Sequence, residues 1–311
     1  MITAYKTMDG ALSSVDISEP HNWINLVNPS KQDLETVAEK TGALLEFLEA
    51  PLDPEERSRI DTEDEQTLII INVPIEADEG ENQTSYDTIP LGLLIIENHF
   101  ITISLEDVDV LEDFINRPLR STSTLKKTRF ALQIFYKTAT YYLKFLKQLD
   151  RKTNEIERSL HRAMKNERLI KLLGLEKSLV YFMTSLKANE IVMRKIFRVN
   201  LLPMYEEDED LLEDVLTEVH QAIDMAEINT NILSGMMDAF ASIISNNLNV
   251  VMKILTSITI ILTIPTMIFS FYGMNVALPG ADWPFTGLVI VIVTIIIAAV
   301  TLYIMRKKNM F

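Results

Sequence analysis

Cysteine is absent from the 311 residues, and histidine occurs only four times. The lack of thiols excludes disulfides, thiolate metal sites and cysteine nucleophiles, and four scattered histidines leave little for a zinc site. Basic residues are also scarce, since 29 Lys and Arg face 44 Asp and Glu and the net charge is −15. This balance argues against nucleic acid as a partner, because phosphate backbones bind clustered Lys and Arg. An acidic surface attracts cations instead.

Residues 1–10 contain no basic segment followed by an apolar run. A secretory signal needs both features, so we expect no signal peptide and a cytoplasmic N-terminus.

Basic residues are missing altogether between Val199 and Met252, where eleven Asp and Glu occur unopposed. Five of these acids form the run 206–210, which capping of a helix N-terminus would also explain. The others lie beyond the first turn, where capping does not account for them, and they include Asp214, Glu218 and Asp238. Unpaired acids on a helix repel one another, so they indicate a cation nearby.

The N-terminal segment 1–120 reads as a cytoplasmic α/β domain. Four short apolar runs predict strands, at Trp23–Val27, Thr67–Val73, Leu91–Ile96 and Phe100–Ser104. The second and third runs are apolar on both faces, which is typical of central strands covered by helices on each side. A helix is expected over Ser30–Thr41.

Long helical periodicity follows. Segment 121–202 predicts two antiparallel helices with a possible break at Gly174, and segment 203–253 predicts a third helix, an acidic stalk.

Two apolar stretches lie near the C-terminus. Ile254–Tyr272 and Phe285–Met305 are 19 and 21 residues without a formal charge, which is long enough to span a membrane. Lys253 precedes the first span, the basic tail 306–311 follows the second, and the connecting loop 273–284 has no Lys or Arg. The positive-inside rule therefore puts both ends in the cytoplasm and the loop outside. The alternative is a buried helical pair in a soluble protein.

The first span and the helix before it carry a regular stripe of mostly polar residues. We call this stripe the polar seam; its members are separated alternately by four and three residues and are Asp238, Ser242, Ser245, Asn249, Met252, Thr256, Thr259, Thr263, Thr266 and Ser270. This spacing puts them on one helix face and predicts a pore lining. Hydroxyls that bond to their own backbone, or that pack between membrane helices, are the alternative. The second span shows no polar stripe beyond Thr294 and Thr301, and we expect it to face lipid. One polar-faced helix cannot enclose an aqueous path, so several copies are needed.

The tripeptide Gly273-Met274-Asn275 follows Tyr272 at the end of the first span. In this position the sequence resembles the CorA family of magnesium transporters, which carries Gly-Met-Asn at the outer end of the first of two C-terminal membrane helices. The stretches Trp23–Leu26 and Asn249–Thr256 are also similar to the family.

The resemblance implies an α+β membrane protein that forms a funnel-shaped homopentamer in the cytoplasmic membrane, with Mg²⁺ as the transported and regulatory ion and no organic cofactor. It implies that Gly273, Met274 and Asn275 form an outer selectivity ring. It also implies that Asn249 forms a polar ring at the cytoplasmic mouth, that Met252 and Leu255 narrow the pore, and that Asp238 forms an acidic ring below. Leu255 lies one step off the polar seam.

Regulation by internal Mg²⁺ is a further implication. Asp214 aligns with a regulatory acid of the family, but its expected Leu-Glu-Asp partner is Leu48-Glu49-Ala50 here. Either Glu49 takes the place of the missing Asp, or the Mg²⁺ sensor has moved to Glu213, Asp214 and Glu218.

Two further departures concern the ion. The family's outer Met-Pro-Glu-Leu segment is replaced by residues 276–282, where Asp282 can supply the negative charge, and Thr263 stands where a bulky apolar gate residue is frequent. The resemblance implies a Mg²⁺ channel, with Co²⁺ and Ni²⁺ as further candidate ions. The alternatives are a proton-coupled Zn²⁺ transporter of the same superfamily and a membrane-anchored cation sensor. No nucleophile and base stand at credible spacing, so we do not expect an enzyme.

Overall fold

The computed structural model describes residues 1–8, 11–78, 84–116, 122–160, 166–199, 202–276, 278, 280 and 283–308. It divides into two compact units, Met1–Ser234 and Gly235–Phe311. Helix α6 contributes residues to both units, and each unit is described by itself.

The first unit contains a seven-stranded mixed sheet in the order β2-β1-β3-β7-β6-β5-β4. Its strands are β1 (Ile2–Met8), β2 (Ala11–Ser14), β3 (Asn22–Val27), β4 (Arg59–Glu63), β5 (Gln66–Asp78), β6 (Thr84–Ile95) and β7 (His99–Ser104). Only the β3–β7 pair is parallel among the pairs of the described strands. The four predicted strands are confirmed as β3, β5, β6 and β7.

One face of this sheet is covered by small helices: α1 (Lys31–Thr41), α2 (Leu45–Glu49) and the 3₁₀ turn η1 (Ala50–Leu52). Ser30 caps α1 by accepting from the Asp33 amide, while the Asp33 carboxylate accepts from the Ser30 amide. Leu34 and Val37 of α1 and Leu48 of α2 are buried against the sheet. The predicted helix at 30–41 is therefore confirmed.

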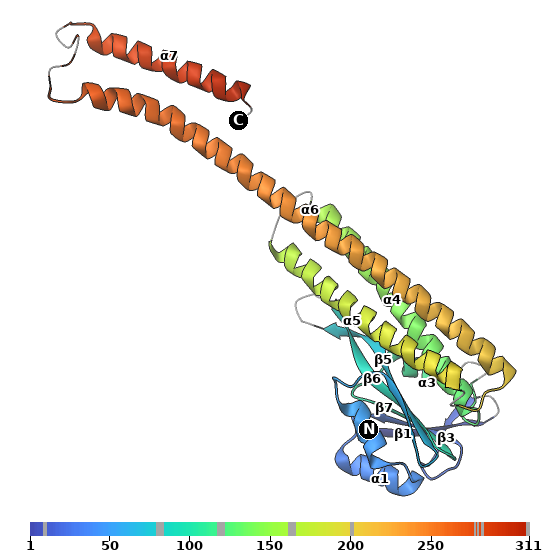
Figure 1. Cartoon of the computed structure of the whole chain (residues 1–311). Coiled ribbons are helices and arrows are strands. Elements are labelled where there is room, and N and C mark those ends of the chain that lie inside the picture. Colours follow the sequence, from blue (N-terminus) through green and yellow to red (C-terminus); the bar gives the residue numbers. More distant parts are fainter. Residues whose placement is uncertain are drawn as a thin grey trace. The chain divides into compact units, whose positions relative to one another are not determined.

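The other face of the sheet carries the long helices α4 (Lys127–Leu160) and α5 (Asn166–Val199), with the short α3 (Asp109–Asn116) beside α4 (Figure 1). Phe130 of α4 packs edge-on against Trp23, with ring centroids 5.1 Å apart, and lies 5.0 Å from Phe100. Helices thus cover both faces of the central strands, as the doubly apolar runs predicted. Gly174 lies inside α5, so the predicted break there is wrong. The buried Leu172, Leu175 and Leu179 hold the helix together through it.

Asn189 joins α5 to the sheet where strand β4 stops. The last β4–β5 pair is Arg59 with Ile70, so the backbone of Asn72, two residues further on, has no partner strand on that side. The Asn189 side chain supplies both missing partners. Its Oδ1 accepts from the Asn72 amide at 2.9 Å, and its Nδ2 donates to the Asn72 carbonyl at 2.8 Å. Tyr142 also donates to this carbonyl, at 2.9 Å.

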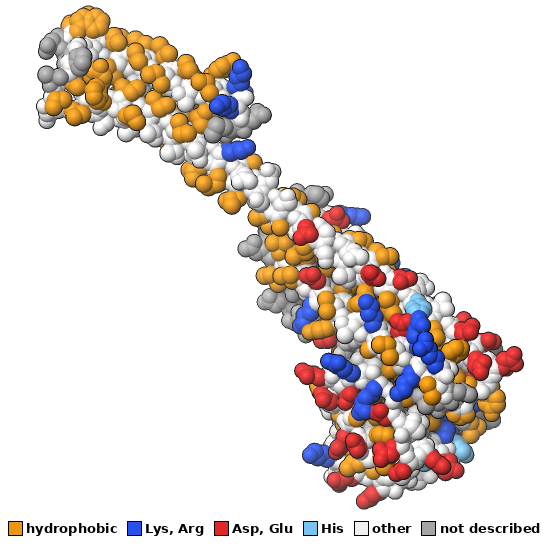
Figure 2. Space-filling view, viewed as in Figure 1, with side chains coloured by type: hydrophobic (Ala, Val, Ile, Leu, Met, Phe, Trp, Pro, Cys, Tyr) orange, Lys and Arg blue, Asp and Glu red, His pale blue; other side chains and the backbone are white. Residues whose placement is uncertain are grey.

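The second unit holds the C-terminal part of α6 (Glu206–Tyr272) and helix α7 (Thr286–Lys307). Both helices are long and apolar enough to cross a membrane. Figure 2 shows the apolar side chains exposed along this part of the chain. Ser257 of α6 and Thr294 of α7 are both buried.

Candidate ion pathway

Helix α6 stays continuous through Pro265. A proline has no amide hydrogen, so the carbonyl four residues before it, that of Ile261, loses its usual partner. The neighbouring Thr266 hydroxyl donates to the Leu262 carbonyl at 2.8 Å. This side-chain bond goes to the next carbonyl along the helix, so it does not replace the partner that Ile261 loses.

Every member of the polar seam is exposed in the single chain, as is Leu255. The opposite side of α6 behaves differently. Ser257 is fully buried, and Ile261, Ile264 and Ile268 are half-buried. The polar seam therefore belongs to the part of the helix that one copy of the chain leaves uncovered, together with apolar residues such as Leu262 and Met267.

The threonine hydroxyls of the polar seam all bond to their own helix where the structure records their bonds. Thr259, Thr263 and Thr266 each donate to the carbonyl four residues before, at 2.7–2.8 Å. This is the back-bonding that the sequence left as an alternative. It does not conflict with a lining role, because a hydroxyl that donates inward keeps oxygen lone pairs for an outside donor such as a cation's hydration water.

A shallow groove of about 430 Å³ runs along this face of α6. Four hydroxyl residues and two apolar residues line it: Thr259, Leu262, Thr263, Thr266, Met267 and Ser270. Four of the six residues belong to the polar seam.

The Gly-Met-Asn segment ends α6. The Gly273 amide donates to the Phe269 carbonyl at 2.9 Å, and a Cβ at Gly273 would lie 3.3 Å from that same oxygen. Met274 and Asn275 follow and are exposed. Asp282, the expected outer charge, lies outside the described residues.

The candidate regulatory acids do not form a metal site within one copy. Glu49, Glu213, Asp214 and Asp238 are exposed and Glu218 is half-buried. No group of three or more His, Asp or Glu among the described residues could hold a metal ion. A site built from these residues needs carboxylates from more than one copy.

The acidic start of α6 is opposed by a cation from another helix, which the sequence analysis missed. Arg129 of α4 donates to Glu207 Oε2 at 2.6 Å, and its Nε lies 4.0 Å from Oδ1 of the buried Asp208. The hydrogen bond from Arg129, together with its charge, lowers the pKa of Glu207. The acids between 199 and 252 are therefore not all unopposed, because Arg129 lies far away in sequence but close in the fold.

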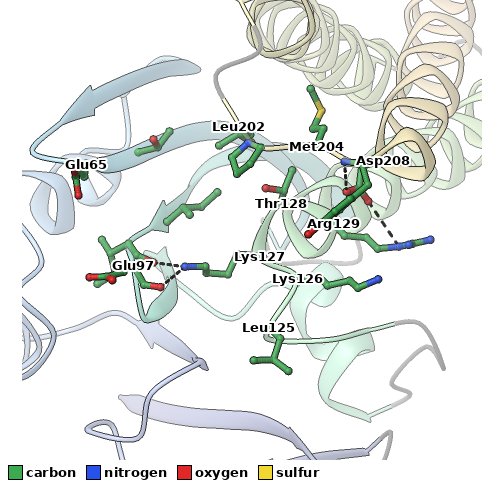
Figure 3. A pocket seen from close by; sticks show the side chains of 15 residues that line it. Glu65, Glu97, Leu125, Lys126, Lys127, Thr128, Arg129, Leu202, Met204 and Asp208 are labelled. Atoms are coloured by element: carbon green, nitrogen blue, oxygen red, sulfur yellow. Dashed lines mark hydrogen bonds and ion pairs between the residues drawn. The ribbon is translucent and has the colours of Figure 1, made fainter.

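Arg129 and Asp208 border a cavity of about 610 Å³ between the β6–β7 turn, the start of α4 and the linker into α6 (Figure 3). Lys127 closes one side by donating to the carbonyls of Ile96 and Glu97 at 2.5 and 2.6 Å. Burial lowers the pKa of Lys127. Asp208 Oδ2 accepts from the Tyr205 amide at 3.1 Å and thereby caps α6, in line with the capping alternative for the 206–210 run.

The chain thus combines a mixed α/β domain with a long helix that ends in an apolar segment and a second apolar helix behind it, and both apolar helices are long enough to cross a membrane. The chain belongs to the CorA-like Mg²⁺ transporter family, whose model matches residues 18–307. The expected resemblance and the fold class, an α/β domain with a long helix and a C-terminal apolar hairpin, are thereby confirmed. Membership of a transporter family also agrees with the expectation that the chain is not an enzyme.

The chain is similar to two curated proteins, both described as cobalt/magnesium transport protein CorA. Identity is 30% over 297 residues with that of Methanocaldococcus jannaschii, covering 92% of this chain and 90% of the relative. It is 23% over 313 residues with that of Thermotoga maritima, covering 98% and 88%. The complete structure of the CorA magnesium transporter from Methanocaldococcus jannaschii superposes with a TM-score of 0.84 at 26% identity, covering 100% of this chain and 99% of that one.

Proposed function

We propose that the chain is one subunit of a homo-oligomeric channel for divalent cations in the cytoplasmic membrane. The observation that carries the proposal is the polar seam, a line of hydroxyl and amide groups that one copy leaves exposed on an apolar helix. Polar groups facing hydrocarbon are costly, whereas several copies around an axis would turn them toward water. The family resemblance suggests five copies, arranged as a funnel.

The ion path would run between two neutral polar rings. Asn275 with Gly273 and Met274 would form the outer selectivity ring, and Asn249 the inner one, followed by Met252 and Leu255 as constrictions. Mg²⁺ gives up its waters reluctantly, so neutral oxygens that hold the hydrated ion cost less than stripping it. Carboxylates at the same place could bind the ion too tightly for release. Asp282 is proposed to attract cations at the outer mouth.

The membrane potential is the proposed driving force. With both termini in the cytoplasm and the loop 273–284 outside, a divalent cation entering across about 100 mV gains about 4.6 kcal/mol, since each charge gains about 2.3. No nucleotide is required for such a flux. Lys253 and the tail 306–311 support this orientation.

Internal Mg²⁺ is proposed to close the channel. Acids gathered at subunit boundaries repel when empty and are bridged when a divalent ion binds, which would favour a symmetric, closed arrangement. Asp214 and Glu49 are the first candidates, with Glu213, Glu218 and Asp238 as further members. Their exposure in the single chain, or half-burial for Glu218, supports this assignment.

The test is uptake of Mg²⁺, Co²⁺, Ni²⁺ and Zn²⁺ into liposomes that contain the purified protein, at a fixed membrane potential. We expect Mg²⁺ entry that follows the potential and is lost or altered in Asn275→Ala, while Val276→Ala in the same loop behaves as wild type. Zn²⁺ entry that follows a proton gradient instead would favour the proton-coupled transporter. No flux of any divalent ion through folded, oligomeric protein would contradict the channel and favour the membrane-anchored sensor.

A further inference from the structure

Helix α4 begins with cations, although a helix N-terminus favours acids. Residues 126–129 include Lys126, Lys127 and Arg129, and the first turn of α4 holds no acid. The amides of a first turn carry partial positive charge, so cations beside them are unfavourable and an anion is attracted. This helix start borders the cavity of about 610 Å³ described above. A basic helix N-terminus at a cavity favours anion binding.

Only one of the three cations is paired with carboxylates. Arg129 contacts the acids at the start of α6. Lys127 donates instead to two neutral carbonyls, and burial lowers its pKa. Lys126 lines the same cavity and is exposed. Neither lysine forms an ion pair with a carboxylate in the part of the chain that the structure describes, so both charges are available to an anion in the cavity.

The first amides of α4 are also free. The amide of Phe130 donates to the Lys126 carbonyl at 2.9 Å and makes the first bond of the helix. No hydrogen bond of the amides of residues 127, 128 and 129 occurs among the described residues. These are the positions whose amides hold phosphates and sulfates at helix N-termini.

Two buried threonine hydroxyls supply independent evidence for a ligand. Thr67 of β5 and Thr128 of α4 line the cavity, and each is only 8% exposed. Neither hydroxyl has a partner within the described ranges, whereas Thr138 and Thr140 of α4 donate to carbonyls of their own helix. Figure 3 shows the Thr128 side chain turned into the cavity beside Arg129. Buried polar groups are normally hydrogen-bonded, so these hydroxyls indicate a bound group that accepts from them.

The remaining wall is largely apolar and too extensive for an inorganic ion alone. Its apolar members are Ile95, Ile96, Leu125, Leu202, Pro203, Met204 and the ring of Tyr205. Cavities that hold small organic molecules measure about 300–1,000 Å³. Glu65 and Glu97 also border the cavity but are exposed, so water and salt screen their charges. The third bordering acid, Asp208, already faces Arg129.

We propose that this cavity binds a small organic phosphate. The phosphate would accept from the free amides of α4, the Thr128 hydroxyl and Lys126, while the organic body would lie against Leu202 and Met204. A phosphate has acceptor oxygens in more directions than a planar carboxylate, which suits donors that converge from several sides. Nucleotides and sugar phosphates share this chemistry.

The site would connect the ligand to the long helix. Residues 202–205 form one wall and lead directly into α6, so a ligand would join the sheet and α4 to the start of the helix that carries the polar seam. This function goes beyond ion transport. Ligand binding is measured without ion flux, so its failure would leave the channel proposal standing, and the reverse also holds.

Titration calorimetry of the full chain in detergent, at a fixed Mg²⁺ concentration, tests the site. The probes are AMP, ribose 5-phosphate, adenosine and inorganic phosphate. We expect AMP or ribose 5-phosphate to bind, and the one that binds identifies the source of the phosphate. Adenosine and inorganic phosphate should each bind at least about tenfold more weakly, because each lacks one half of the contacts. No binding of either organic phosphate at millimolar concentration would overturn the proposal. Equal binding of inorganic phosphate would also overturn it, since the site would then hold an adventitious ion only.

Two substitutions locate the phosphate. Thr128→Val should weaken binding of the organic phosphate by about threefold to tenfold without lowering the melting temperature of the ligand-free protein, because the hydroxyl has no partner to lose. Lys126→Ala should weaken it by at least about tenfold. Thr140→Val and Lys147→Ala, at exposed positions of the same helix, are the matched controls and should bind as wild type. Wild-type affinity in both test variants would overturn the assignment.

Hydrogen exchange locates the ligand without any substitution. The organic phosphate that binds, AMP or ribose 5-phosphate, should slow exchange at residues 125–129 and 202–205, which line the cavity, and leave helix α1 unchanged. Slower exchange confined to other segments would place the ligand elsewhere and contradict the proposal.

Discussion

At the scale of single residues, Asn189 takes the place of a missing strand, because its amide pairs with both backbone groups of Asn72. Asn189→Ala should destabilise the protein by about 1–3 kcal/mol, since the amide of the half-buried Asn72 would lose its acceptor. Asn189→Asp should cost at least as much, because it keeps that acceptor but buries a carboxylate and sets its second oxygen against the Asn72 carbonyl. Thermal unfolding of the full chain in detergent measures both. Thr184→Ala, exposed on the same helix, should change stability by less than about 0.5 kcal/mol; an equal loss in Thr184→Ala would contradict the assignment.

His99 makes stability depend on pH. It is buried, its Nδ1 lies 2.6 Å from Asn22 Oδ1, and burial lowers its pKa below the ordinary 6.5, with Lys127 and His21 adding to the effect. Below pH 6.5 the unfolded chain therefore binds a proton that the folded chain resists. This contribution is complete above about pH 6.5 and is lost as the pH falls.

The melting temperature of wild type should accordingly drop more between pH 7 and pH 5 than that of His99→Gln. Gln32→Ala, exposed on α1, serves as the control and should retain the wild-type drop. An identical drop in His99→Gln and wild type would show that His99 does not contribute.

Some residue positions could be predicted from the sequence and others could not. The hydroxyl register along α6 follows from helix periodicity, so the exposure of the polar seam was predictable. The pairing of Arg129 with Glu207 and Asp208 was not, because nearly 80 residues separate the partners and no local pattern links them. The hydrogen bonds between Asn189 and Asn72 could not be predicted for the same reason.

At the scale of elements, two glycines should respond to alanine in opposite ways. Gly174 lies inside α5 with no atom within 4 Å of an added Cβ, so Gly174→Ala should stabilise the protein by about 0.5–1 kcal/mol through helix propensity. Gly92 of β6 faces Pro51 of η1, whose Cγ an added Cβ would overlap. Gly92→Ala should destabilise by about 1–3 kcal/mol.

Urea or thermal unfolding of the two variants beside wild type measures the contrast. Gly92→Ala at wild-type stability would mean that η1, which follows Glu49, can move away from the sheet. A loss of stability in Gly174→Ala would mean that α5 is strained at this glycine.

Periodicity predicted the long helices and the doubly apolar strands, because those elements bury regular sets of side chains. Strands β1, β2 and β4 were not predicted, since they are partly exposed and therefore lack that signal. The Gly174 break was a wrong prediction because helix propensity is weak beside the burial of Leu172, Leu175 and Leu179.

At the scale of the whole molecule, gating should depend on the acids at the start of α6. If internal Mg²⁺ closes the channel through Asp214, then Asp214→Asn should keep carrying Mg²⁺ at internal concentrations that stop wild type. The variant lacks the carboxylate that Mg²⁺ would bridge to hold the closed state. Uptake into liposomes preloaded with graded Mg²⁺ measures this. Glu35→Gln, exposed on α1, is the matched control. Equal inhibition of Asp214→Asn and wild type would remove Asp214 from the sensor.

The number of subunits could not be read from residue spacing, because one chain carries one face of a pathway that several chains enclose. The need for more than one copy could be predicted from the spacing, because a polar stripe on one helix cannot enclose a path by itself. The contacts that would set that number belong to the assembly.

The central claim is that the polar seam of α6 lines a water-filled path for divalent cations. It is tested most directly by potential-driven Mg²⁺ uptake through Thr263→Cys before and after a charged, membrane-impermeant thiol reagent, with Ile295→Cys on α7 as the control. Ile295 is 62% exposed on an apolar helix. The account predicts that the reagent reduces Mg²⁺ uptake by at least about tenfold for Thr263→Cys, because a bulky charge placed in the path obstructs the cations that pass through it, and leaves Ile295→Cys unchanged. Uptake through Thr263→Cys that the reagent does not alter, with modification of the protein verified by mass, would contradict it.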